Sequence, residues 1–194
     1  MFQKLNLKFI VIFALIATWS STSMPVWALS MDDLVMREAI YYEKFSNIPF
    51  TGAVDEVNER GVFRGGKKDG QWLLYSSDGQ LLSDVTYADG KRFGTYRSFH
   101  PNGKTHNLGQ FDNQGRMHGN WIYYSRFGDL TGDINYKHGK LHGSFKKWYV
   151  NGQPDWDCNY HLHKVHGQCK TWFYDGSVNP IYTGTFHHGK KIND

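Results

Sequence analysis

Residues 143–152 read Gly143-Ser-Phe-Lys-Lys-Trp148-Tyr-Val-Asn151-Gly152, and this is one copy of a motif that recurs along the chain. Each copy begins with glycine, continues with aromatic residues and closes in Asn-Gly, Asp-Gly or another glycine turn. The leading glycines are 24, 25, 24 and 24 residues apart: Gly70, Gly94, Gly119, Gly143 and Gly167. Self-similarity at a fixed period of this length is typical of repeat architectures. The chain is therefore predicted to be an array of like units.

A second motif follows each copy of the first, and it consists of an aromatic residue, two further residues and Gly-Lys. Its clearest copies are Tyr87-Ala-Asp-Gly90-Lys91, Tyr136-Lys-His-Gly139-Lys140 and Phe186-His-His-Gly189-Lys190. Aromatic segments of about eight to ten residues bounded by such turns are hairpin signals. The expected fold is all-β: an elongated antiparallel β-meander of stacked hairpin repeats, with a short N-terminal helix. About a dozen strands would give a twisted sheet on the order of 55 Å long.

The register of the strands follows from the turns if Asp78-Gly79 and Gly90-Lys91 are two-residue turns. Trp72 then lies opposite Val85, and Val85 lies opposite Tyr96. The same column continues through Gly109, Trp121, Ile134, Phe145, Cys158, Cys169 and Tyr182. Three tyrosines beside it (Tyr87, Tyr136, Tyr160) fall opposite Gly94, Gly143 and Gly167. One face of the sheet is thus predicted to carry an almost continuous apolar column, with aromatic rings covering cross-strand glycines.

A second aromatic column lies three residues after the first and therefore has the opposite parity. Its members are Tyr75, Phe99, Tyr124, Trp148 and Trp172. Either this column decorates the other face of the sheet, or a glycine bulge near the Asn-Gly turns switches faces. The sequence leaves both alternatives open.

Residues 1–28 have the pattern of a signal peptide, with basic Lys4 and Lys8 before the apolar segment Phe9–Ala17. Cleavage is expected near Ala28, after a small-residue site, and the product would be periplasmic or extracellular. The alternative is an uncleaved anchor, although the apolar segment is short for a membrane helix. Without Lys4 and Lys8 the chain keeps 20 basic against 18 acidic residues. That balance does not favour nucleic acid as a partner.

The mature chain is expected to have two parts, a cap over residues 29–49 and the repeat array over residues 50–192. A carboxylate three residues after Ser30 resembles a capping box, which predicts a short helix over Asp32–Glu38. Repeat arrays need covers at their ends. The N-terminal segment is expected to cover one end, and the irregular hairpin around Gly184–Gly189 the other.

The repeated pattern Gly-x-aromatic-x-x-aromatic, then Asn/Asp-Gly, then aromatic-x-x-Gly-Lys resembles the MORN repeat variant over Phe50–Lys191. The nearest bacterial grouping is the YwqK-family antitoxin. The resemblance implies scaffolding, protein binding and sometimes lipid association, and it implies no shared catalytic residues. An export signal does not fit a cytoplasmic antitoxin, so the resemblance predicts the fold and not an antitoxin role.

The two cysteines, Cys158 and Cys169, are direct cross-strand partners in the predicted register. Their separation should suit a disulfide, and export would permit one. The alternative is a pair of small buried hydrophobic side chains. No Cys-x-x-Cys motif or neighbouring base points to a redox or nucleophilic role.

Three histidines, His161, His163 and His166, are closely spaced and would share one polar face, where imidazoles could hold zinc or copper. However, His118, His142 and His166 all precede a repeat glycine, which favours a solvated turn position. No metal site and no cofactor are therefore predicted.

Basic residues take equivalent turn positions along one edge of the predicted sheet. They are Lys67, Lys91, Arg116, Lys140, Lys164 and Lys190. A row of charges roughly 10 Å apart could meet anionic lipid, acidic glycan or an acidic protein surface. The alternative is that Gly-Lys is good turn chemistry that keeps the edge soluble.

The chain contains no Gly-x-Ser-x-Gly, His-Glu-x-x-His or phosphate-loop motif, so it is not expected to be an enzyme. The expected function is that of a non-catalytic exported repeat protein, a protein-interaction or scaffold module whose partner is another protein. The alternative is a cell-envelope binder of anionic lipid or glycan that uses the aromatic and basic columns.

Overall fold

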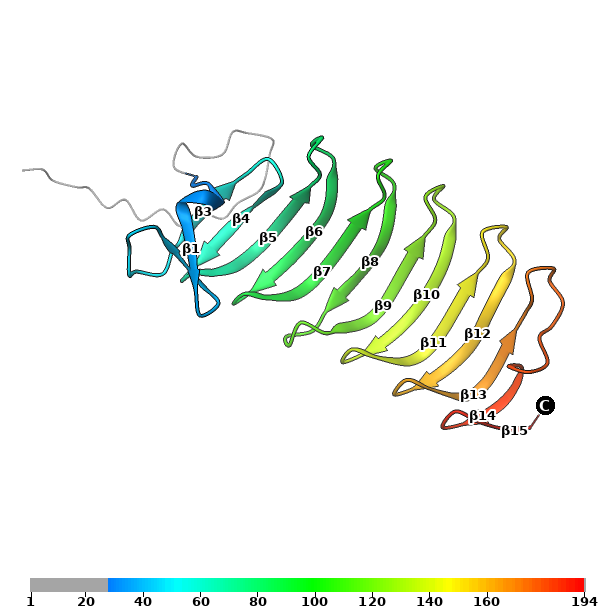
Figure 1. Ribbon diagram of the computed structural model, residues 1–194. Coiled ribbons are helices and arrows are strands. Elements are labelled where there is room, and N and C mark those ends of the chain that lie inside the picture. Colours follow the sequence, from blue (N-terminus) through cyan, green and yellow to red (C-terminus); the bar gives the residue numbers. More distant parts are fainter. Residues whose placement is uncertain (1–27, 194) are drawn as a thin grey trace, which may run out of the picture.

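A computed structural model describes residues 28–193, which fold almost entirely as β-structure. The predicted signal peptide lies outside the described residues apart from Ala28. Thirteen strands form one antiparallel sheet in strict chain order, from β3 to β15, and lie side by side along an elongated, curved array (Figure 1). No helix among the described residues is long and apolar enough to span a membrane.

The strands of the long sheet are β3 (Gly52–Asp55), β4 (Glu59–Arg64), β5 (Lys67–Tyr75), β6 (Leu81–Ala88), β7 (Lys91–Phe99), β8 (Thr105–Phe111), β9 (Met117–Tyr124), β10 (Leu130–Lys137), β11 (Lys140–Trp148), β12 (Pro154–His161), β13 (Lys164–Thr171), β14 (Gly184–His187) and β15 (Lys190–Asn193). A separate two-stranded sheet consists of β1 (Leu34–Arg37) and β2 (Ile40–Glu43). The predicted all-β meander is confirmed.

The predicted apolar column is confirmed across most of the sheet. Trp72 pairs with Val85, which pairs with Tyr96, and Tyr96 pairs with Gly109. The column continues on the later strands, where successive members pair in the order Trp121, Ile134, Phe145, Cys158 and Cys169. The prediction is wrong at the C-terminal end of the column, because Cys169 pairs with Gly184 rather than with Tyr182. The connection between β13 and β14 is longer than a hairpin turn, and counting through a two-residue turn fails there.

Two kinds of turn alternate along the array. Turns on one edge are mostly two residues long, as at Asp89-Gly90, where both residues have positive φ (50° and 78°). Loops on the other edge hold three residues, as at Ser77–Gly79, where the glycine has φ 83°. The predicted two-residue turns Asp78-Gly79 and Gly90-Lys91 are therefore wrong in length or position, and register shifts elsewhere in each hairpin restore the column.

The leading glycine of each repeat lies in one of these register shifts. Gly94, for example, falls where Val85 pairs with Tyr96 but Tyr87 already pairs with Arg92. All five leading glycines have φ between 69° and 92°. A Cβ at Gly94 would meet no heavy atom within 4 Å. The same holds at Gly70 and Gly167, so left-handed backbone, rather than lack of space, requires glycine at the start of these repeats.

The predicted pairing of tyrosines with glycines is wrong by one strand. Tyr87 pairs with Gly70 on the preceding strand and not with Gly94, because the bulge displaces the register. The rings that cover glycines are tryptophans, since a Cβ at Gly109 would fall within the indole of Trp121. The equivalent contact near the N-terminal end of the array is between Gly61 and Trp72. Each of these indoles also donates a hydrogen bond to a backbone carbonyl, at 3.1 Å.

The predicted helix over Asp32–Glu38 is wrong. Ser30 does form the capping box, but only a single 3-10 turn follows it, over Met31–Asp33. The chain then enters β1, which pairs with β2 through a turn at Glu38-Ala39, where both residues have positive φ. Pairing of the apolar residues in β1 and β2 thus overrides the local helix signal.

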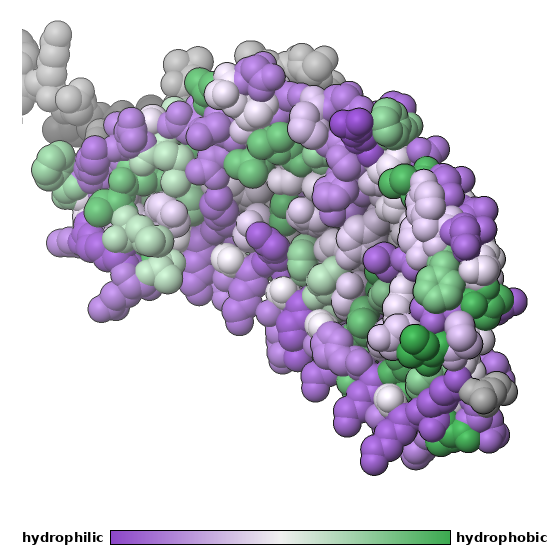
Figure 2. All heavy atoms as spheres, turned by 45° about the vertical axis from the view of Figure 1, so that its right-hand side comes forward, coloured by the Kyte–Doolittle hydropathy of each residue, from purple (hydrophilic) through white to green (hydrophobic). Residues whose placement is uncertain are grey.

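The N-terminal segment packs on the first end of the array. Leu34 is buried in one cluster with Val54, Phe63 and Trp72, and the ring of Tyr41 lies 4.7 Å from that of Phe63. Elsewhere the described residues form a single layer, whose apolar side chains gather in a band between hydrophilic borders (Figure 2). Burial is concentrated in the central column, and large parts of both faces remain accessible.

Candidate binding surface

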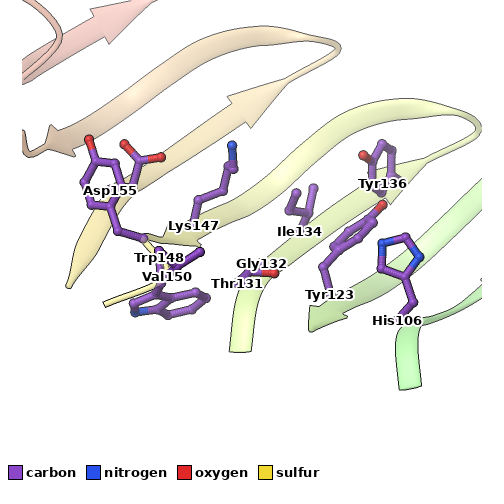
Figure 3. A pocket seen from close by; sticks show the side chains of 11 residues that line it. His106, Tyr123, Thr131, Gly132, Ile134, Tyr136, Lys147, Trp148, Val150 and Asp155 are labelled. Atoms are coloured by element: carbon purple, nitrogen blue, oxygen red, sulfur yellow. The ribbon is translucent and has the colours of Figure 1, made fainter. Parts of the chain in front are cut away.

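A pocket of about 560 Å³ opens on the array between β8 and β12. Its lining is rich in aromatic side chains, including Tyr123, Tyr136 and Trp148, together with Ile134 (Figure 3). In Figure 3 the two tyrosines gather with His106 at one end, and Trp148 lies with Val150 at the other. The lining therefore offers flat apolar surface with hydrogen-bonding tips.

Three of the lining residues owe their place to β-bulges. His106, Thr131 and Asp155 are the unpaired residues at three equivalent register shifts, each just after a three-residue loop. A bulge bends the strand and re-aims its side chains. Gly132 pairs with Tyr123, and the small residue leaves room beside the tyrosine ring. The repeat itself thus builds the pocket, and the sequence alone did not indicate it.

Burial favours the neutral form of three side chains that line the pocket, Tyr123, Tyr149 and His106. It raises the pKa of Tyr123, and a neighbouring Tyr136 hydroxyl raises that pKa further. Burial also raises the pKa of Tyr149, with a smaller contribution from Asp155. Burial lowers the pKa of His106, with a smaller effect from nearby His100. Such phenols and imidazole suit hydrogen bonding and stacking with a ligand.

The second aromatic column lies near the edge that carries the three-residue loops, and its members are half-buried. Tyr75 and Trp172 contact the cations of Arg60 and Lys170, each 5.1 Å from the ring centroid. Both cations alternate with residues of the apolar column and so face the other side of the sheet. The structure therefore favours the first alternative for these two aromatics. Trp148 borders the aromatic pocket.

The basic residues do share one edge, the one with mostly two-residue turns. Five of them open a strand, namely Lys67, Lys91, Lys140, Lys164 and Lys190, and Arg116 directly precedes β9. The row is partly neutralised, because Lys67 pairs with Asp89 at 2.7 Å and Arg116 with Asp112 at 2.8 Å. Among residues 28–193 the remaining four have no carboxylate within 4.0 Å. The row is therefore weaker than a continuous line of charge.

Asp112 is the most strongly held carboxylate of this edge. The guanidinium of Arg116 donates two hydrogen bonds to it, at 2.8 and 2.9 Å, and His138 lies 2.8 Å away. These contacts, chiefly that with Arg116, lower the pKa of Asp112 well below its usual range. Asp89 follows the same pattern, since Lys67 lowers its pKa.

The histidines gather differently from the predicted set. The ring centroids of His161 and His166 are 5.8 Å apart, but His163 turns away and accepts a hydrogen bond from the Leu141 amide at 3.2 Å. His187 and His188 join the cluster instead, each 5.1 Å from His166. The spacing of His161, His163 and His166 gave no indication of these two residues, although they occupy the second motif directly after Phe186. Burial, and then neighbouring His187, lowers the pKa of His188.

Cys158 and Cys169 form a disulfide between the paired strands β12 and β13. Their Cα atoms are 4.0 Å apart, and both residues are buried in the apolar column. The bridge thus replaces a hydrophobic pair such as Ile134 and Phe145 in the preceding repeat.

Comparison with known proteins supports the repeat assignment. The model of the MORN repeat variant matches residues 68–89 and 94–113, which correspond to the hairpins β5–β6 and β7–β8. No curated protein matches the chain. Among solved structures the chain is similar to one described as "Crystal structure of GtfA/B complex bound to UDP and GlcNAc", at 13% identity and a TM-score of 0.22. That likeness covers 69% of this chain and 24% of the other, and it carries no functional argument.

Proposed function

We propose that this protein is a non-catalytic binding module whose aromatic pocket between β8 and β12 engages a segment of another protein. MORN-type repeats point to a binding role, and the aromatic pocket is the observation that supports a protein partner. Tyrosine and tryptophan are enriched at protein interfaces, where they bury large area at little entropic cost. The pocket is lined by one tryptophan and three tyrosines, which match that pattern.

Site-specific photo-crosslinking tests this proposal. A photo-reactive aromatic residue replaces Trp148 at the pocket, and in a control it replaces the exposed Asn159 on β12. We expect the probe at position 148 to form a protein adduct that is lost when Tyr123→Ala is added. Equal adducts from positions 148 and 159, or an adduct insensitive to Tyr123→Ala, would count against the pocket.

The second candidate is an anionic envelope surface met by the basic edge. Lys91, Lys140, Lys164 and Lys190 are exposed and lack a carboxylate partner among residues 28–193. Each juxtamembrane cation contributes about 1 kcal/mol to binding an anionic membrane. Binding to anionic liposomes that weakens with salt, and weakens further in Lys140→Gln/Lys164→Gln, would support this candidate. Retention unaffected by either change would exclude it.

We also propose that the chain is exported and cleaved near Ala28, on the pattern of residues 1–28. Mass spectrometry of the protein recovered from cell fractions tests this directly. A cytoplasmic protein of full mass would instead leave room for a role like that of the YwqK-family antitoxins. A processed protein outside the cytoplasm would exclude it.

A further inference from the structure

The last two hairpins bring a group of histidines together at one edge of the array. We propose that His166, His187 and His188 bind one divalent transition metal ion of the zinc class. Each of the three offers a ring nitrogen, and these nitrogens lie within 4.8 Å of one another. Imidazole nitrogens without thiolate or carboxylate are ligands for Zn²⁺ and its neighbours rather than for Mg²⁺ or Ca²⁺.

The fold explains why three histidines from two strands and a turn converge. Gly167 pairs with Phe186, so His166 and His187 lie next to each other across β13 and β14. Successive residues of a strand normally point to opposite faces. His188, however, opens the turn with φ 49°, in the left-handed region, and its ring lies 4.4 Å from that of His187 and 5.1 Å from that of His166.

His166 also has a buried ring nitrogen, as do the equivalent histidines of two other repeats. Nδ1 of His166 is buried and has no hydrogen-bond partner among the described residues. Nδ1 of His118 and of His142 is unpaired in the same way, so this feature belongs to the repeat. Of these three histidines, only His166 has two further imidazole nitrogens within 4.8 Å among the described residues. A metal bound through Nδ1 would offset part of the cost of leaving that nitrogen without a partner. The fourth tetrahedral position would be filled by water or by His161, whose ring lies 5.8 Å from that of His166.

A similar group elsewhere on the same edge provides a contrast. Asp112, His118 and His138 also offer ligand atoms within 4.8 Å of one another. There the carboxylate already accepts two hydrogen bonds from Arg116, a cation that a metal ion would have to displace. The C-terminal group contains no such internal cation, although exposed Lys164 lies near His188. Selective binding is therefore expected at the C-terminal group.

Metal binding would fasten the last hairpin to the array. Only three residue pairs join β14 to β13, fewer than between the central strands. A metal that holds His166 on β13 together with His187 and His188 spans the same junction. This gives a structural readout that does not depend on any activity of the protein.

Isothermal titration of the full chain, purified without a histidine tag and stripped with EDTA, tests the proposal. We expect one Zn²⁺ per chain and no response to Mg²⁺. His166→Gln and, separately, exposed His188→Gln should each weaken Zn²⁺ binding by more than the roughly 10- to 100-fold typical of losing an outer-shell partner. The matched control His118→Gln/His138→Gln should bind as the parent does.

Hydrogen exchange with and without Zn²⁺ gives the independent measurement. Protection should increase in β14 and β15 of the parent and not in His188→Gln. The proposal is overturned if Zn²⁺ does not bind, if the control loses binding as strongly as the C-terminal variants, or if bound Zn²⁺ leaves β14 and β15 unchanged. Because His188 is an exposed turn residue, its variant keeps the fold and the test remains decisive.

Discussion

Individual glycines and carboxylates stabilise this fold in different ways. Gly94 supplies a left-handed backbone angle, whereas Gly109 supplies space for the indole of Trp121. Asp112 neutralises part of a basic edge. The sequence indicates that such residues recur. It does not show which glycine lies at a bulge and which lies under an indole ring, because the bulges depend on pairing between strands.

Substitution of either glycine should destabilise the protein, but for different reasons. Gly109→Ala is expected to reduce the free energy of unfolding by about 3 kcal/mol, because the new Cβ would overlap Trp121. Gly94→Ala should cost roughly 1–2 kcal/mol through backbone strain, and Gly94→Asn less. Denaturant unfolding of the three variants measures these values. Equal costs for Gly94→Ala and Gly94→Asn would contradict the backbone explanation.

Asp112 should make stability depend on pH. Because its pKa is lowered in the folded state, its contribution is present above the unfolded pKa of about 4 and is lost as the pH falls below it. The Tm difference between the parent and Asp112→Asn should therefore be largest near neutral pH and shrink below about pH 4. Thermal melts from pH 2 to 8 measure this, with Asp157→Asn as an exposed control. A difference that stays constant across the range would contradict the assignment.

At the scale of strands and hairpins, the sequence predicted the period, the all-β class and most of the apolar column. It could do so because a two-residue alternation and a 24- or 25-residue repeat leave few registers that keep Trp72, Val85 and Tyr96 on one face. The bulges and the fate of Asp32–Glu38 could not be predicted. Both depend on which strand pairs with which, and that information is not local.

The disulfide stabilises one hairpin of the array. Cys158 and Cys169 are separated by 11 residues, and a bridge closing a loop of this size contributes about 3 kcal/mol. Reduction should lower the free energy of unfolding by about that amount. Thiol labelling of the unfolded, unreduced protein should modify neither residue. Labelling of both would show that the bridge does not form.

At the scale of the whole molecule, a single curved layer leaves both faces and both edges accessible. The lining of the aromatic pocket includes three bulge residues from successive hairpins, His106, Thr131 and Asp155. Its position could not be predicted from the aromatic columns, because bulges are invisible to simple alternation. The pocket is thus a property of several neighbouring repeats and not of one.

Trp148→Ala should weaken binding of the crosslinked partner by about 2 kcal/mol, or roughly 30-fold, as expected for an aromatic hot spot. Tyr75→Ala removes an equivalent aromatic from a distant repeat and should leave the affinity unchanged. Titration calorimetry with the purified partner measures both. Equal losses from the two variants would indicate a general effect on the array.

Hydrogen exchange of the protein with and without that partner tests the binding account most directly. We predict that protection on binding concentrates in residues 117–161, the strands β9 to β12 around the pocket. Protection confined to the basic turns at Lys91, Lys140 and Lys164, with none in β9 to β12, would contradict it.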